Sequence, residues 1–217
     1  LLTGGDIDPE SLQRAPNGDL WVGDEFGPWL LHFDRRGVLL DTPYPLPGDL
    51  RSPNNPFLAF GETATHPNSR GIEAMAISTA GRHLYAALEG ATVADNATGG
   101  PVFRRHIFEF SLRDRHFTGR QWAYRTRTAG NMVSDIAAVD RHHLVLIERD
   151  GGLGLTAVDR KVNLIDLRRT DADGYVRSTL LVDLATIADP ALVSLPPLHD
   201  GDIRLGDPFG VVCESIE

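Results

Sequence analysis

The chain has 217 residues, of which 41% are hydrophobic and 24% are charged, and its formal net charge is −9. These proportions are those of an ordinary globular protein with enough residues for a sizeable core. The acidic balance, without a stripe rich in Lys and Arg, argues against nucleic acid as a partner. The single cysteine, Cys213, excludes an internal disulfide and a cysteine-based zinc site. No apolar run reaches the length of about 18 residues that a membrane span needs.

Acidic residues recur along the chain at a long and nearly constant spacing. Glu10 and Glu73 are 63 residues apart, and Glu73 and Asp135 are 62 residues apart. Each of these acids opens a short apolar stretch, which a turn joins to a second apolar stretch that ends at another acid. The closing acids are Asp24 and Glu25, then Glu89, then Glu148 and Asp150. A further copy is expected to begin at Glu217. Self-similarity at a long period indicates a repeat architecture.

Taken in chain order, each repeat contains four short apolar stretches that we interpret as strands. The first repeat has them at 11–14, 20–23, 30–34 and 38–43. The second has them at 74–78, 83–88, 106–112 and 121–125, and the third at 136–139, 143–147, 162–167 and 177–184. Turn sequences such as Pro16-Asn17-Gly18-Asp19 and Ala80-Gly81-Arg82 separate them. Four antiparallel strands per repeat favour a β-propeller over a barrel or a sandwich.

The expected fold is therefore an all-β propeller of four-stranded antiparallel blades, in a single domain over residues 1–217. The blades are expected at about 9–47, 72–127 and 134–184, with a further blade starting at 214–217. Propellers have about four to eight blades. We therefore expect this chain to hold three complete blades of an incomplete ring, with flanking sequence missing.

The recurring acids are expected to gather at one mouth of the propeller channel. The first strand of a blade lines the axis and the second runs antiparallel to it, so the start of the first and the end of the second lie at the same end. So many carboxylates need raised pKa values, basic partners or a bound cation, and hard oxygen ligands favour Ca²⁺. The candidate metal ligands are Glu10, Asp24, Glu25, Glu89, Asp135, Asp150 and Glu217.

Plainer interpretations stand beside this one. The strand-opening acids could bond backbone amides of the neighbouring blade, and Asp24, Glu25 and Asp150 could be solvated turn charges. Asp6-Ile7-Asp8 resembles a cation loop without the full spacing, so an ordinary turn is the alternative. No Gly-x-Ser-x-Gly segment supports a serine nucleophile. The three tryptophans are expected in the core rather than in a binding platform: Trp21, Trp29 and Trp122.

Several of these segments also resemble, in the same order, the blocks of a known family. They are Asp8-Pro9-Glu10-Ser11, Gly23-Asp24-Glu25-Phe26-Gly27-Pro28, Ser69-Arg70-Gly71-Ile72-Glu73, Ser134-Asp135-Ile136, Glu148-Arg149-Asp150 and Glu214-Ser215-Ile216-Glu217. The family is that of the phytase-like propeller proteins, described by an esterase-like activity of phytase. Ala74 stands where the family usually has Gly. The resemblance implies an exported bacterial protein, periplasmic or secreted, although no signal peptide stands in this chain.

The resemblance implies a hydrolase that acts on a small-molecule phosphoester or other ester at an acidic mouth that holds Ca²⁺. Arg70, Arg149 and Lys161 would then bind phosphate oxygens, and Glu73 or Glu148 would be the catalytic base. Two alternatives stay open. One is a non-catalytic propeller that binds a ligand or a protein partner, and the other is a lactonase-like esterase for neutral esters. The oligomeric state is left open.

Overall fold

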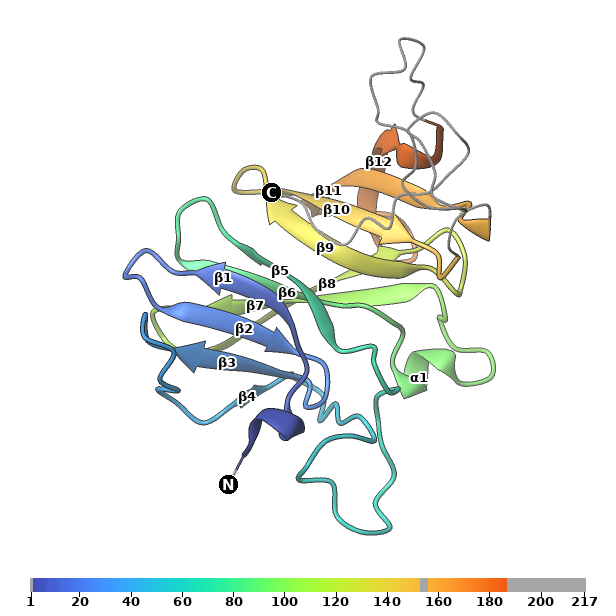
Figure 1. The fold of residues 1–217 in the computed structure, drawn as a ribbon. Coiled ribbons are helices and arrows are strands. Elements are labelled where there is room, and N and C mark those ends of the chain that lie inside the picture. Colours follow the sequence, from blue (N-terminus) through green and yellow to red (C-terminus); the bar gives the residue numbers. More distant parts are fainter. Residues whose placement is uncertain (1, 153–155, 187–217) are drawn as a thin grey trace, which may run out of the picture.

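The computed structural model describes residues 2–152 and 156–186, which are almost entirely β-structure (Figure 1). The first sheet contains β1 (Pro9–Arg14), β2 (Leu20–Asp24), β3 (Trp29–Phe33) and β4 (Tyr44–Pro45). The second contains β5 (Ile72–Ile77), β6 (His83–Leu88), β7 (Arg104–Ser111) and β8 (His116–Arg125). The third contains β9 (Met132–Ala138), β10 (His143–Arg149), β11 (Arg160–Thr170) and β12 (Val176–Asp183). Helical structure in the described residues is short and comprises α1 (Val93–Asn96), the 3-10 turns Gly4–Asp6 and Leu184–Thr186, and 3-10 conformation at Thr156.

Each sheet is an antiparallel meander whose strands pair in chain order. The first strands of the three sheets lie innermost, because β5 contacts β1 on one side and β9 on the other. Figure 1 shows the three sheets side by side, with the second between the first and the third. They are three blades of a β-propeller, as the repeats predicted, and the described residues do not close a ring.

The fourth strand of the first blade is where the sequence prediction was wrong. Residues 38–43 were expected to form it, but the structure pairs β4, at Tyr44–Pro45, with β3. The earlier segment makes only an isolated bridge, between Phe33 and Leu39. Its Asp41 bonds His32 instead, with 2.6 Å between Oδ2 and Nδ1. The segment is therefore held by the side-chain bond between Asp41 and His32 and by a single bridge, rather than by a paired strand.

Two apolar clusters fill the spaces between neighbouring blades. The cluster between the first and second blades includes Trp21, Leu30, Ile72, Met75, Leu84 and Phe110. The cluster between the second and third includes Ala74, Tyr85, Ile107, Ile136, Leu146 and Ile165. Trp21 and Trp29 are buried and Trp122 packs at the edge of the second cluster, so the core assignment of the tryptophans is confirmed.

Polar contacts join the blades across these clusters. Gln13 Nε2 donates to the Met75 carbonyl at 2.8 Å, and Trp122 Nε1 donates to the Leu167 carbonyl at 2.8 Å. Arg105 is buried, and its guanidinium bonds the backbone carbonyls of Asn131 and Ala129, at 3.1 and 2.9 Å. These bonds satisfy a charged group that burial would otherwise leave costly, and they fix the second blade against the third.

Candidate functional site

Carboxylates of the first two blades converge at one end of the propeller. The ligand oxygens of Asp8, Glu10 and Glu25 lie within 4.8 Å of one another. Those of Glu25, Glu73 and Glu89 meet the same limit, so Glu25 belongs to both groups. We call these five residues the acid cluster. Its members stand at the start of β1 and β5 and at the end of β2 and β6, which is the arrangement that the strand directions predicted.

A β-bulge aims two of these side chains. The pairing of β1 with β2 runs from Pro9 to Ser11 and skips Glu10, and the pairing of β5 with β6 runs from Ile72 to Ala74 and skips Glu73. A bulge leaves its extra residue unpaired and redirects its side chain. In the third blade the skipped residue is Ser134, not Asp135. Asp135 therefore stands one residue away from the position that Glu10 and Glu73 share.

Two guanidinium groups reach the acid cluster. Arg149 Nη2 lies 3.3 Å from Glu89 Oε1 and 3.7 Å from Glu73 Oε1. Arg70 Nη1 bonds the other Glu89 oxygen, Oε2, at 2.5 Å. Arg149 comes from β10, so the third blade contributes a cation to the acids of the first two. Its Nε is buried and has no hydrogen-bond partner among the described residues.

One peptide unit holds the backbone of the cluster together. The carbonyl of Gly71 accepts the amides of both Glu73 and Glu89, each at 3.0 Å. A Cβ at Gly71 would lie 2.5 Å from Cα of Glu25. Only glycine allows the chain to pass so close to Glu25 while it bonds the other two acids.

Electrostatics at the cluster favour the arrival of positive charge. Burial, together with Glu89, Glu25 and Glu10, raises the pKa of Glu73 to about 8. Burial, with Glu89, Glu10 and Asp8, raises the pKa of Glu25 to about 7. Burial also raises the pKa of Glu89, against the lowering effect of Arg70 and Arg149. At neutral pH the cluster therefore retains protons that a bound cation would displace.

Other acids predicted for the site have backbone partners. Asp24 is fully buried, and its two oxygens accept the amides of Asp8 at 2.7 Å and Gly27 at 2.6 Å. Asp135 accepts the amide of Ile136 at 2.8 Å. Neither belongs to the two carboxylate groups. Asp24 thus holds the turn that presents Glu25.

Asp150 also holds a loop. Its Oδ2 accepts the amides of Val158 and Asp159, each at 2.8 Å, and its Oδ1 bonds Arg160 at 2.6 Å. Although partial burial opposes it, this set of donors lowers the pKa of Asp150 to about 2. Asp150 is therefore an ionised anchor of the connection between β10 and β11.

Glu148 and Lys161 have partners away from the acid cluster. Glu148 is fully buried; its Oε2 accepts the Tyr124 hydroxyl at 2.5 Å, and its Oε1 accepts Asn131 Nδ2 at 2.6 Å. Lys161 Nζ bonds Asp159 at 2.6 Å and Asp183 at 3.2 Å. Glu217, the last predicted ligand, lies outside the described residues.

Sequence reasoning did not include Asp8 among the ligands. The Asp6-Ile7-Asp8 segment resembles a cation loop, but an ordinary Asp-rich turn is the interpretation that its incomplete spacing favours. The structure brings Asp8 in through the backbone, because its carbonyl accepts the amide of Glu25 at 3.0 Å. This pairing lies beyond the bulge at Glu10, and the spacing of the acids along the sequence does not reveal it.

The fold and this site define a β-propeller with an acidic mouth into which two arginines reach. Residues 2–217 match the Phytase-like family, described as esterase-like activity of phytase. The chain therefore belongs to that family, which confirms the resemblance seen in its motifs. It is also similar to an uncharacterized secreted protein of Arthroderma benhamiae (strain ATCC MYA-4681 / CBS 112371), with 28% identity over 114 residues. That match covers 45% of this chain but only 22% of the relative. No helix among the described residues is long and apolar enough to span a membrane.

Proposed function

We propose that this protein hydrolyses phosphoester or other ester bonds at the acid cluster, with a divalent cation, Ca²⁺, held by its carboxylates. Membership of the phytase-like family supports ester hydrolysis at a coarse level. The observation that carries the proposal is the pair of carboxylate groups that share Glu25 beside two guanidinium groups. Hard carboxylate oxygens from several segments suit Ca²⁺, which takes about six to eight oxygen ligands.

The proposed ligands are Asp8, Glu10, Glu25 and Glu89. Bound Ca²⁺ would supply Lewis acidity and would neutralise the charge of a phosphate. Arg149, at the border between Glu73 and Glu89, would bind phosphate oxygens in place of these carboxylates, since a guanidinium fits an oxyanion in bidentate fashion. Its unpartnered Nε is a donor that such a contact could use.

Glu73 is the proposed general base. A catalytic base works best when its pKa lies near the working pH, and burial beside other acids raises the pKa of Glu73 to about 8. Glu148, the other candidate, already accepts hydrogen bonds on both oxygens from Tyr124 and Asn131. We therefore assign Glu148 to the joint between the second and third blades.

A non-catalytic propeller that binds a ligand or partner is the second candidate. The contacts of Glu89 favour it. Glu89 already bonds Arg70 and contacts Arg149, so its negative charge is neutralised by these arginines without a bound cation. We also propose that the protein is exported. The support is the secreted relative and the resemblance to exported bacterial proteins, and a periplasmic setting belongs to the same proposal.

An activity screen with matched variants tests the proposal. The purified protein is assayed on p-nitrophenyl phosphate, bis(p-nitrophenyl) phosphate and p-nitrophenyl acetate, with Ca²⁺ or with a chelator. We expect turnover that needs Ca²⁺, is lost in Glu73→Gln and is kept in Asp173→Asn, whose carboxylate lies exposed in the turn before β12. Ca²⁺ binding without turnover of any substrate would favour the binding propeller. Equal turnover with the chelator would remove the Ca²⁺-dependent mechanism.

A further inference from the structure

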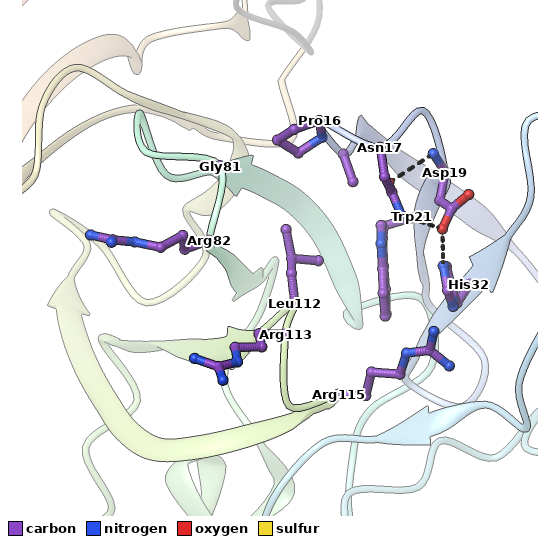
Figure 2. Close-up of a pocket in the computed structure, with 11 residues that line it drawn as sticks. Pro16, Asn17, Asp19, Trp21, His32, Gly81, Arg82, Leu112, Arg113 and Arg115 are labelled. Atoms are coloured by element: carbon purple, nitrogen blue, oxygen red, sulfur yellow. Dashed lines mark hydrogen bonds and ion pairs between the residues drawn. The ribbon is translucent and has the colours of Figure 1, made fainter.

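A second hollow lies at the opposite end of the first two blades from the acid cluster. Figure 2 shows the residues that line it. Three hairpin turns surround it, those between β1 and β2, between β5 and β6, and between β7 and β8. Its volume is about 250 Å³. The hollow is separate from the proposed catalytic site. Trp21, at the start of β2, lines the hollow, whereas Glu25 follows the last residue of the same strand.

The floor of this hollow is apolar and contains an unused hydrogen-bond donor. Trp21 is 2% exposed, and its ring stacks on His32 with 4.2 Å between centroids. Leu112 lines the facing side. The indole N–H of Trp21 has no acceptor among the described residues, whereas Trp122 donates to the Leu167 carbonyl at 2.8 Å. This N–H is therefore available to an oxygen placed in the hollow.

The carboxylates beside the hollow are already paired. His32 Nε2 lies 3.1 Å from Asp19 Oδ2, and its Nδ1 lies 2.6 Å from Asp41 Oδ2. Arg115 Nη1 lies 3.2 Å from the other Asp41 oxygen. Figure 2 shows Arg115 turned toward His32. The two carboxylates at this wall thus already have His32 and Arg115 as partners.

Two more arginines at the opening have no such partner. Arg82 and Arg113 line the hollow on the far side of Leu112 and are exposed (Figure 2). Neither forms an ion pair with any residue in the described part of the chain. The opening therefore carries an excess of positive charge in a chain whose net charge is −9.

We infer that this hollow binds a small organic anion with a flat apolar body. The body would lie between Trp21 and Leu112. Its anionic oxygens would accept the indole N–H of Trp21 and N–H groups of Arg82 and Arg113, which line the opening. Guanidinium groups and an apolar, aromatic-lined pocket together recognise aryl carboxylates and aryl phosphates. This inference does not depend on the proposed function.

Titration of ¹⁵N-labelled protein tests the inference, with benzoate and phenyl phosphate as probes and phenol as the neutral control. The indole resonance of Trp21 is assigned as the one missing in Trp21→Phe. We expect it to shift in a saturable way with either anion, and not with phenol. The indole resonances of Trp29 and Trp122 should stay in place.

Variants locate the binding. The double change Arg82→Ala and Arg113→Ala should weaken the anion by about tenfold or more, and because both side chains are exposed the melting temperature should not change. Arg168→Ala, which removes an exposed arginine of the third blade, should bind as the unmodified protein does. No saturable shift with either anion, an equal shift with phenol, or full affinity in the double variant would each overturn the inference.

Discussion

His66 donates its Nε2–H to the carbonyl oxygen of Arg70, with 2.6 Å between the two atoms. His66 is fully buried, and burial lowers its pKa to about 4, so it is neutral at physiological pH. The neighbouring Ser69 has a φ of 46°, in the left-handed region that non-glycine residues seldom adopt. This bond therefore anchors the turn that presents the Arg70 guanidinium to Glu89.

Replacing His66 by alanine should destabilise the protein and loosen Arg70. The change leaves a buried carbonyl with only the long bond from the Gly90 amide, at 3.4 Å, and an unpaired buried polar group costs about 1–3 kcal/mol. Urea unfolding measures the loss. His66→Gln, which keeps a donor, should lose less. Equal stability of His66→Ala and the unmodified protein would show that the bond does not anchor the turn.

Gly71→Ala should be strongly destabilising, whereas Gly130→Ala should be nearly neutral. The added Cβ at Gly71 meets backbone atoms of Glu25, the nearest at 2.5 Å, while nothing lies within 4 Å of the corresponding position at Gly130. Neither glycine has a φ in the left-handed region. Forced overpacking costs about 1–3 kcal/mol. Thermal unfolding of the two variants gives the comparison, and a neutral Gly71→Ala would contradict the close approach.

Without a bound cation, stability should fall as the pH rises from about 5 to 8. The pKa of Glu73 is 4.5 in an unfolded chain and about 8 in the folded protein. Across that window the folded state binds more protons than the unfolded state, so raising the pH favours unfolding. Each unit of pKa difference corresponds to about 1.4 kcal/mol. The slope should be smaller in Glu73→Gln, as urea unfolding in a chelator at several pH values will show. A stability that rises through this window would contradict the raised pKa.

Much of the fold could be predicted from the sequence because its signals are local. Alternating apolar residues and turn sequences located eleven of the twelve described strands. The segment at 38–43 also looked like a strand, but the partner that decides its position is His32, through Asp41. Such a tertiary contact leaves no trace in the pattern of the segment itself.

Strand direction alone predicts which acids lie at the same end of the blades, and only this part of the site could be predicted from the sequence. Glu10, Glu25, Glu73 and Glu89 meet because the start of one strand and the end of the next share an edge. Asp135 repeats the same spacing, yet the bulge of its blade falls on Ser134. A shift of one residue in register changes the face on which a side chain lies, and the spacing of acids does not reveal such a shift.

Calorimetric titration with Ca²⁺ tests the central claim, that the acid cluster is a cation site, most directly. The shared position of Glu25 makes it the decisive residue, because Glu25→Gln removes a ligand from both carboxylate groups. We expect saturable binding to the unmodified protein and to Asp173→Asn, and none to Glu25→Gln. The bound cation should also stabilise the fold by about 2.7 kcal/mol at a hundredfold excess over its dissociation constant. A folded Glu25→Gln variant that binds Ca²⁺ with unchanged affinity would contradict the account.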